Sequence, residues 1–311
     1  MVFKKLVLID GLSRSGKNAF VDLITSLKNS ENIEMNYVFE HIVEGMSLKL
    51  IDKKFVKNFF FKFLNEIAYN KFLSRNSNFR KSDKSSVQNF SFPNLYFKRL
   101  REKDGNHIFK KLKKTKNFFP FMTHEILTNI DYFDSLNLNY KMISVLRNPF
   151  DIVYSWYKKK VIKNKKNFTL TFSYKEKYFP WYVYNDHKKW LGLNEIDKIA
   201  FIVEKLIKNS IQKFKKIKDK NKFIFVTYEQ HVEKPHFVLK KICRFLKTNY
   251  SSQTKRKIKL ANLPIKIDED LRKSKIIFLK KNLSPYLFNK IQRLEKSYNK
   301  NLYGFNKNKL R

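Results

Sequence analysis

The feature that most constrains this chain is a short apolar run followed at once by a loop with two glycines. The run at residues 5–10, K-L-V-L-I-D, is typical of a buried parallel strand. The loop at residues 11–18 reads G-L-S-R-S-G-K-N, and apolar residues then recur at helical spacing from Ala19 to Leu27. Glycine lets the backbone wrap around an anion, and a helix N-terminus adds partial positive charge. The segment therefore predicts a phosphate-binding strand–loop–helix unit.

The composition of the chain makes this loop more informative. Gly11 and Gly16 are two of only six glycines in the sequence, which argues against chance, and Arg14 and Lys17 add formal positive charge. The loop matches G-x-x-x-x-G-K-[ST] except at Asn18, which replaces the hydroxyl that holds magnesium in P-loop NTPases. No strand ends in a clear Walker B aspartate. We therefore expect an anion site without a metal, and a nucleotide-dependent kinase is an incomplete alternative.

Three further segments read as strands and are separated by helical patterns. They cover residues 118–123, 141–146 and 222–227. Alternating strands and helices predict an α/β fold with a central, mostly parallel sheet flanked by helices. We expect residues 1–311 to form a single domain of this kind. Ligands bind beyond the carboxyl ends of the strands in such sheets, so the loops there should carry the chemistry.

Two segments between the first and second strands have distinct patterns. Residues 52–75 place phenylalanines between lysines at helical spacing, which predicts an amphipathic helix that packs on the core. Peripheral contact of this helix with a membrane surface is an additional hypothesis. Residues 76–94 are rich in serine and asparagine and have no clear period. We predict a mobile loop there, bordering a substrate cleft.

The chain is strongly basic, with 67 Lys and Arg against 27 Asp and Glu and a formal charge of +40. Such a charge would suit a nucleic-acid-binding protein. However, the abundance of Lys, Asn, Ile and Phe is what an AT-rich genome imposes on any protein. We interpret the lysine runs at 110–116 and 158–166 as solvated faces and expect no specific nucleic-acid binding. A positive field still favours an anionic substrate.

Cysteine content and hydropathy limit the remaining classes of protein to which the chain could belong. A single cysteine, Cys243, cannot form an intrachain disulfide, and no Cys/His cluster has metal-ligand spacing. No stretch approaches the roughly 18 to 20 apolar residues of a membrane-spanning helix, and no signal peptide is visible. We expect a cytoplasmic protein without a metal. The sequence does not indicate an oligomeric state.

The strand at 141–146 runs directly into a second informative loop. Residues 147–157 read R-N-P-F-D-I-V-Y-S-W-Y, with Arg147 at the strand end and Ser155 on the next helix, so both can face one anion. Here the chain resembles sulfotransferases that use 3′-phosphoadenosine 5′-phosphosulfate (PAPS), which carry R-N-P-x-D-x-x-x-S-x-Y. The resemblance implies that Arg147 and Ser155 bind the 3′-phosphate of PAPS. A structural interpretation is also open, in which Arg147 pairs with a carboxylate and Asp151 with Ser155 caps a helix.

Other segments extend the resemblance from Gly11 to Gly304. The phosphosulfate loop of the family has Lys or Arg before Ser-Gly, as at Arg14-Ser15-Gly16, and then usually two threonines. Lys17 and Asn18 stand there in this chain. The resemblance implies a P-loop-like sulfotransferase fold in which Arg14 through Asn18 contact the donor. Later matches are Thr227-Tyr228-Glu229, Pro235, Leu239, Ile242, Phe245-Leu246, Leu283-Ser284-Pro285 and Tyr303-Gly304.

Sulfuryl transfer requires a base for the acceptor's proton and a positive group for the leaving phosphate. Arg14, at the apex of the loop and always charged, is our candidate for the second role. His124 follows the strand at 118–123 and precedes Arg147 by 23 residues, and cytosolic sulfotransferases resemble this with a catalytic His in K-T-H. A histidine suits general-base work near neutral pH. Family members that act on sugars use a Glu after the first helix; the alternative bases are Glu40, His41 and Glu44, then Glu125.

The resemblance predicts a sulfotransferase that moves a sulfuryl group from PAPS to a hydroxyl or amine acceptor. We favour a carbohydrate or glycolipid acceptor. The aromatic stretch at 178–190 could stack on a sugar, contact an aromatic acceptor or fill the core. The alternatives are a P-loop kinase and a basic nucleic-acid-binding protein, but the second leaves residues 147–157 unexplained.

Overall fold

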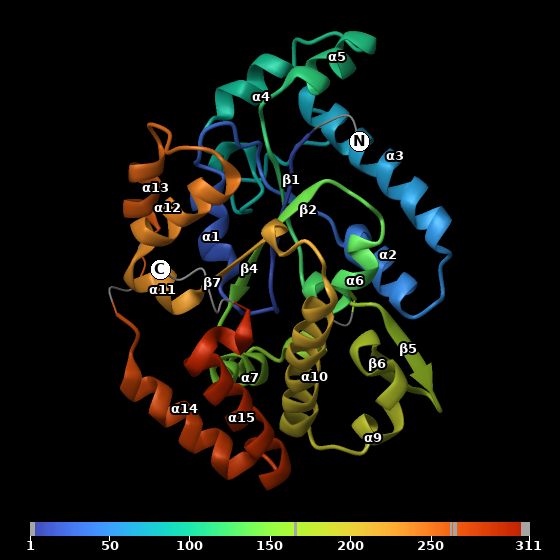
Figure 1. The fold of residues 1–311 in the computed structure, drawn as a ribbon, viewed down its shortest axis with the longest axis vertical. Helices are drawn as coiled ribbons and strands as arrows, with labels where there is room; N and C mark the ends of the chain where they lie inside the picture. The colour runs from blue at the N-terminus through green and yellow to red at the C-terminus, as the bar shows by residue number, and fades with distance from the viewer. Residues whose placement is uncertain (1–3, 165–166, 262, 264–265, 306–311) are drawn as a thin grey trace.

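The computed structural model describes residues 4–164, 167–261, 263 and 266–305, so the ends of the predicted domain and Lys165–Lys166 of the second lysine run lie outside the described residues. A five-stranded sheet has the order β2-β3-β1-β4-β7, and every pairing in it is parallel. Its strands are β1 (Leu6–Asp10), β2 (Glu34–Met35), β3 (Phe119–Met122), β4 (Tyr140–Leu146) and β7 (Phe223–Thr227). Figure 1 shows them crossing the centre of the molecule between helices. The predicted α/β class and four of these strands are confirmed.

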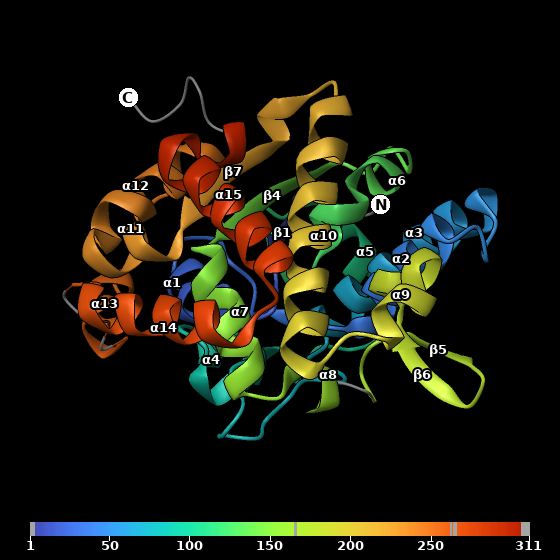
Figure 2. The ribbon, with the colours of Figure 1, turned by 90° about the horizontal axis from the view of Figure 1, so that it is seen from below.

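Helices surround the sheet, and several shorter 3-10 turns connect them. The α-helices are α1 (Lys17–Ile24), α2 (Tyr37–Ser47), α3 (Lys53–Phe72), α4 (Pro93–Arg99), α5 (Asn106–Lys114), α6 (Ile130–Asp134), α7 (Pro149–Lys158), α8 (Val161–Asn164), α9 (His187–Leu191), α10 (Glu195–Lys216), α11 (Tyr228–Glu233), α12 (Pro235–Leu246), α13 (Thr254–Leu260), α14 (Glu269–Asn282) and α15 (Pro285–Asn301). Figure 2, which looks at the molecule from below, shows α7, α10 and α15 close together.

Alternating side chains of the central strand build a core on each face of the sheet. Val7 and Ile9 pack with α1 and α12, in the cluster that holds Phe20 and Leu239. Leu6 and Leu8 point to the opposite face, whose larger cluster includes residues of α2, α3 and α10. Because β1 is buried along its whole length, its sequence is a continuous apolar run. The sheet is thus covered on both faces.

Three of the strands were not predicted. Strand β2 has only two residues, too few for a period. Strands β5 (Thr171–Tyr174) and β6 (Lys177–Pro180) form a separate antiparallel hairpin. Its turn residues Lys175 and Glu176 both have positive φ, 45° and 61°. The paired aromatics on either side of this two-residue turn were the signal that could have revealed the hairpin.

The two patterned segments after α2 have different outcomes. Helix α3 confirms the amphipathic prediction, since Val56, Phe60 and Leu64 are buried at a spacing of four. Residues 76–94 form turns and the 3-10 helix Val87–Asn89, tied by hydrogen bonds such as Asn89 Nδ2 to the carbonyl of Lys81 at 2.6 Å. Their mobility stays a prediction. None of the helices described here is long and apolar enough to cross a membrane.

Gly11 sets how closely the phosphate loop approaches the sheet. Its φ is 147°, and a Cβ built there would lie 2.4 Å from the carbonyl oxygen of Val145 on β4. Real Cβ atoms do not come this close to backbone, so the strand itself would have to move. Glycine is therefore required where β1 leaves the sheet.

We predict that Gly11→Ala lowers the free energy of unfolding by about 2 to 5 kcal/mol, because backbone strain and overpacking add. The matched control is Gly192→Ala, where the nearest atom would be an ordinary 3.6 Å away. Urea denaturation should show the control within about 0.5 kcal/mol of the parent. A Gly11→Ala protein of parental stability would contradict the close approach.

Candidate active site

The loop between β1 and α1 ends in an open helix N-terminus. Gly16 occupies the N-cap position with φ 95° and offers no side-chain hydrogen bond to the first turn. The ring of Tyr228 fills the space of the missing side chain, because a Cβ on Gly16 would lie 2.3 Å from it. The first amides of α1 are thus not capped by the residue before them, which leaves donors and partial positive charge for an anion.

Buried contacts fix the shape of the loop from inside. Lys17 is 4% exposed, and its ammonium donates to the carbonyls of Gly11 and Leu12. Trp156 Nε1 donates to the carbonyl of Ser13 at 2.8 Å. The side chain of Lys17 therefore points inward and stabilises its own loop. Its position in the sequence motif did not reveal this orientation.

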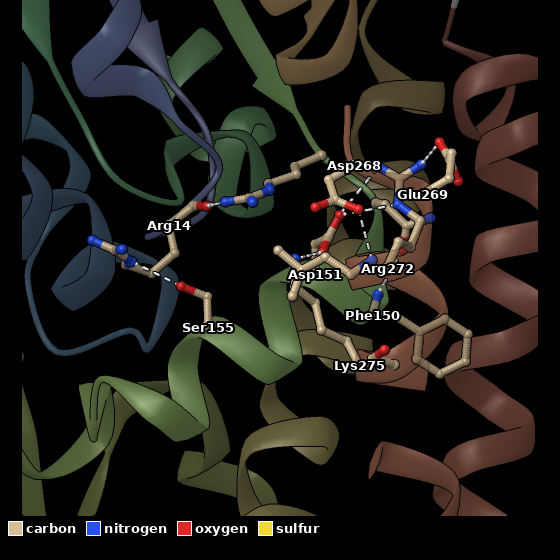
Figure 3. A network of polar contacts seen from close by, with 12 residues as sticks. Arg14, Phe150, Asp151, Ser155, Asp268, Glu269, Arg272 and Lys275 are labelled. Atoms are coloured by element: carbon tan, nitrogen blue, oxygen red, sulfur yellow. Dashed lines mark hydrogen bonds and ion pairs between the residues drawn. The ribbon is translucent and has the colours of Figure 1, made fainter. Parts of the chain in front are cut away.

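The two predicted anion sites lie side by side. Arg14 has φ 67°, and its Nε donates to Ser155 Oγ at 3.0 Å. Arg147 Nη1 donates to the carbonyl of Arg14 at 3.0 Å, and its guanidinium lies 4.5 Å from the centre of the Tyr228 ring. Figure 3 shows Arg14 and Ser155 facing each other across the gap between the loop and α7. The structure thus brings Arg14, Arg147 and Ser155 together.

Two buried polar atoms of this region have no hydrogen-bond partner among the described residues. These atoms are Ser15 Oγ and Arg147 Nε. Buried donors without partners are costly and rare in native proteins, so a ligand is a natural partner for them. Asn18, the remaining predicted contact, is exposed on the first turn of α1.

Asp151 of the R-N-P-F-D segment has partners that the sequence did not reveal. Lys275 Nζ donates to Asp151 Oδ1 at 2.7 Å, and Arg272 Nη2 donates to Asp151 Oδ2 at 3.2 Å and to Glu229 Oε1 at 3.1 Å (Figure 3). Burial opposes ionisation of Asp151, but Lys275, Arg147 and Arg272 outweigh it and hold its pKa below the usual value. Helix α14 is thereby fastened beside Arg147.

Asp10 positions the loop that carries His124. This buried carboxylate, the last residue of β1, accepts from Thr123 Oγ1 at 2.8 Å and from the amides of Ile126 and Leu127 at 3.0 Å each. Three donors on one carboxylate tie the turn after β3 to the start of the phosphate loop.

The leading candidate base, His124, and its first alternative, Glu40, meet at this turn. Glu40 Oε1 accepts from the backbone amide of His124 at 2.7 Å and lies 3.1 Å from His124 Nδ1, although 84 residues separate the pair in sequence. Burial, Glu125 and Glu44 raise the pKa of Glu40 well above its usual value, against the opposing effects of the His124 amide and Lys17. The site therefore contains a carboxyl–imidazole pair in contact beside the phosphate loop.

The other candidates surround this pair in supporting positions. His41 Nδ1 lies 3.0 Å from Glu44 Oε2, and burial raises the pKa of Glu44 despite this contact. Glu125 accepts from the amide of Ser13 at 2.9 Å, so it braces the phosphate loop. Sequence reasoning missed Tyr37, whose ring lies 6.0 Å from that of His124 and 6.2 Å from that of His41. Its place on the helix of Glu40 and His41, three and four residues before them, was the available signal.

The model of the sulfotransferase domain family matches residues 4–263. Among solved structures the chain is similar to the sulfotransferase domain from the curacin biosynthetic pathway, with 14% identity over 96% of this chain and 97% of that one and a TM-score of 0.45. It is also similar to the sulfotransferase domain from the Synechococcus PCC 7002 olefin synthase, with 13% identity over 81% and 76% and a TM-score of 0.43. A sulfotransferase from Alicyclobacillus acidocaldarius matches with 14% identity over 96% and 97% and a TM-score of 0.37. No curated protein sequence matches the chain significantly.

The raised pKa of Glu40 makes stability depend on pH. Its protonated form stabilises the fold fully below the unfolded value of 4.5, and this contribution is lost as pH rises through the folded pKa. Glu40→Gln should therefore raise Tm at pH 7.5 by a few degrees, since about 1 kcal/mol moves Tm by about 2 to 4 °C in large domains. The gain should vanish near pH 4.5, as measured by calorimetry at both pH values. Glu233→Gln, at an exposed helical position, is the control and should change nothing; a destabilised Glu40→Gln at pH 7.5 would refute the electrostatic picture.

Proposed function

This chain belongs to the sulfotransferase domain family, and we propose that it transfers the sulfuryl group of PAPS to a hydroxyl or amine of a carbohydrate or glycolipid. Members of this family are enzymes, and membership implies PAPS as the sulfuryl donor. One observation carries the proposal. The phosphate loop and the R-N-P-F-D segment, which lie far apart in sequence, converge through Arg14, Arg147 and Ser155 on one positively charged region.

The residues of this region fit the donor. The open N-terminus of α1, with Gly16 and the exposed Asn18, suits the 5′-phosphosulfate, as does Ser15 Oγ, which has no partner among the described residues. Lys17 supports this loop from beneath, with its ammonium on the carbonyls of Gly11 and Leu12. Arg147, whose Nε also lacks a partner among the described residues, and Ser155 suit the 3′-phosphate. Bound there, PAPS supplies an electrophilic sulfuryl group on a phosphate leaving group. Among the residues described, no cluster of three His, Cys, Asp or Glu could hold a metal ion.

His124 is our proposed base, with Glu40 as its orienting partner. A proton on Nδ1 that is donated to Glu40 leaves Nε2 as the basic nitrogen of the ring, and Nε2 then takes the acceptor's proton. The carboxylate stabilises the imidazolium that forms, by the same logic as in a Ser-His-Asp triad. If Glu40 is instead the base, its raised pKa makes it a stronger base than an ordinary carboxylate. The two assignments differ in their pH dependence.

Arg14 is the proposed stabiliser of the leaving phosphate. Its exposed guanidinium is held at the loop apex by Ser155 and by the contact of Arg147 with its carbonyl. A fixed positive group next to developing negative charge lowers the barrier without reorganisation of solvent. The high positive charge of the chain adds a general attraction for the anionic donor.

The first prediction of this proposal concerns donor recognition. The protein should bind 3′-phosphoadenosine 5′-phosphate at least about tenfold more tightly than 5′-AMP, because charge-assisted bonds to the 3′-phosphate contribute about 1.5 to 3 kcal/mol. Isothermal titration calorimetry measures both affinities. Arg147→Ala should remove the preference, whereas Arg101→Ala, an exposed arginine outside the site, should keep it. Equal affinities in the parent would reject the assignment of the 3′-phosphate site.

The second prediction separates the base from its partner. His124→Ala should lower the rate of sulfuryl transfer by about 100-fold to 10,000-fold and leave product affinity nearly unchanged. Glu40→Gln should cost less and shift the acidic limb of the pH–rate profile, since it changes the charge next to the imidazole. An inactive Glu40→Gln protein, together with a His124→Ala protein that keeps near-normal turnover, would instead assign Glu40 as the base.

A further inference from the structure

An apolar cavity adjoins the candidate active site. It has a volume of about 280 Å³ and lies between α7, α8 and the β5–β6 hairpin. Its lining is dominated by large apolar side chains, namely Trp156, Val161, Ile162, Phe179, Tyr182 and Trp190. An apolar cavity of about 150 Å³ already holds benzene, so this one accommodates a two-ring compound or a short alkyl segment.

Two lining residues join the cavity to the phosphate loop. Trp156 Nε1 donates to the carbonyl of Ser13, and Tyr182 OH lies 3.4 Å from Glu125 Oε2. Glu125 in turn accepts from the amide of Ser13. One wall of the cavity is therefore built from side chains that brace the loop proposed to hold the sulfuryl donor.

Exposed aromatic rings lead from the proposed base toward the cavity. The ring of Tyr37 lies 6.0 Å from His124 and 5.6 Å from Phe168, the neighbour of the lining residue Thr169. Phe168 is 57% exposed and Tyr178, which lines the cavity, is 59% exposed. Figures 1 and 2 both show the hairpin on the side of the molecule that carries α2. These rings are too exposed to serve only the core.

We propose that this cavity binds an apolar portion of the acceptor, so that the substrate is an amphiphilic alcohol, with a glycolipid favoured over a free sugar. The inference rests on the proposed sulfotransferase function. The hydroxyls of a free sugar would lose their bonds to water in an apolar cavity, whereas an alkyl or aryl group gains from burial. Lys163, also on the wall, offers an alkyl stem inside and an ammonium at the surface for a polar headgroup.

The test measures binding with a neutral two-ring fluorescent probe, 6-propionyl-2-(dimethylamino)naphthalene. We expect the parent to bind it saturably, octyl β-D-glucoside below its micelle concentration to displace it, and glucose to leave it bound. Thr171→Trp should fill the cavity and weaken probe binding by at least about tenfold. Ser173→Trp is the matched control, because this exposed residue of the same strand does not line the cavity.

Ile162→Asp gives an independent variant if Thr171→Trp is unfolded by circular dichroism, since a charge on the wall should also expel an apolar ligand. With PAPS present, octyl glucoside should be sulfated at least about tenfold more efficiently than methyl glucoside. Absent probe binding, equal displacement by glucose, or parental probe affinity in the folded cavity variants would overturn the inference. Failure to bind 3′-phosphoadenosine 5′-phosphate would instead overturn the proposed function, because the probe experiments need no donor.

Discussion

The hydrogen bonds of Asp10 are the interaction on which the rest of the site depends. This carboxylate lies at the end of β1, one residue before the phosphate loop, and binds the turn after β3 through Thr123, Ile126 and Leu127. The same carboxylate therefore positions both the phosphate loop and the turn that carries the proposed base, His124. Two more carboxyl groups reinforce this arrangement. Glu40 accepts a hydrogen bond from His124, and Glu125 accepts one from Ser13 of the phosphate loop.

The parallel sheet explains why these contacts form in one place. Strands β3, β1 and β4 are neighbours, and each delivers its following loop to the same edge of the sheet. The turn with His124, the phosphate loop and the Arg147 segment follow these three strands in spatial order. Trp156 and the Arg14–Ser155 bond then connect the second and third loops directly. Topology thus converts three separate sequence motifs into one continuous polar surface.

Local patterns in the sequence predicted the structural features that depend on residues close together in the chain. The buried strands read as apolar runs, and the glycines of the phosphate loop stand out in a glycine-poor chain. Contacts between distant residues carry no such pattern. Nothing in the spacing shows that Glu40 binds His124 across 84 positions or that Arg272 binds Asp151 across 121. The inward direction of Lys17 also escaped prediction, because a motif fixes a side chain's position and not its hydrogen-bond partners.

Acidic and basic side chains occupy different parts of the candidate site in this basic protein. Acidic residues are scarce, 27 against 67 basic ones, yet Glu40, Glu44 and Glu125 are all buried around the proposed base. Burial and repulsion by neighbouring carboxylates raise the pKa values of Glu40 and Glu44, as is common among the titratable groups of active sites. In contrast to these buried carboxyl groups, the exposed Arg14 and the partly exposed Arg147 are proposed to bind an anionic donor. In the proposed mechanism, positive charge at the surface attracts the sulfuryl donor, and the carboxyl groups beneath it surround His124, the proposed base, within the same few loops.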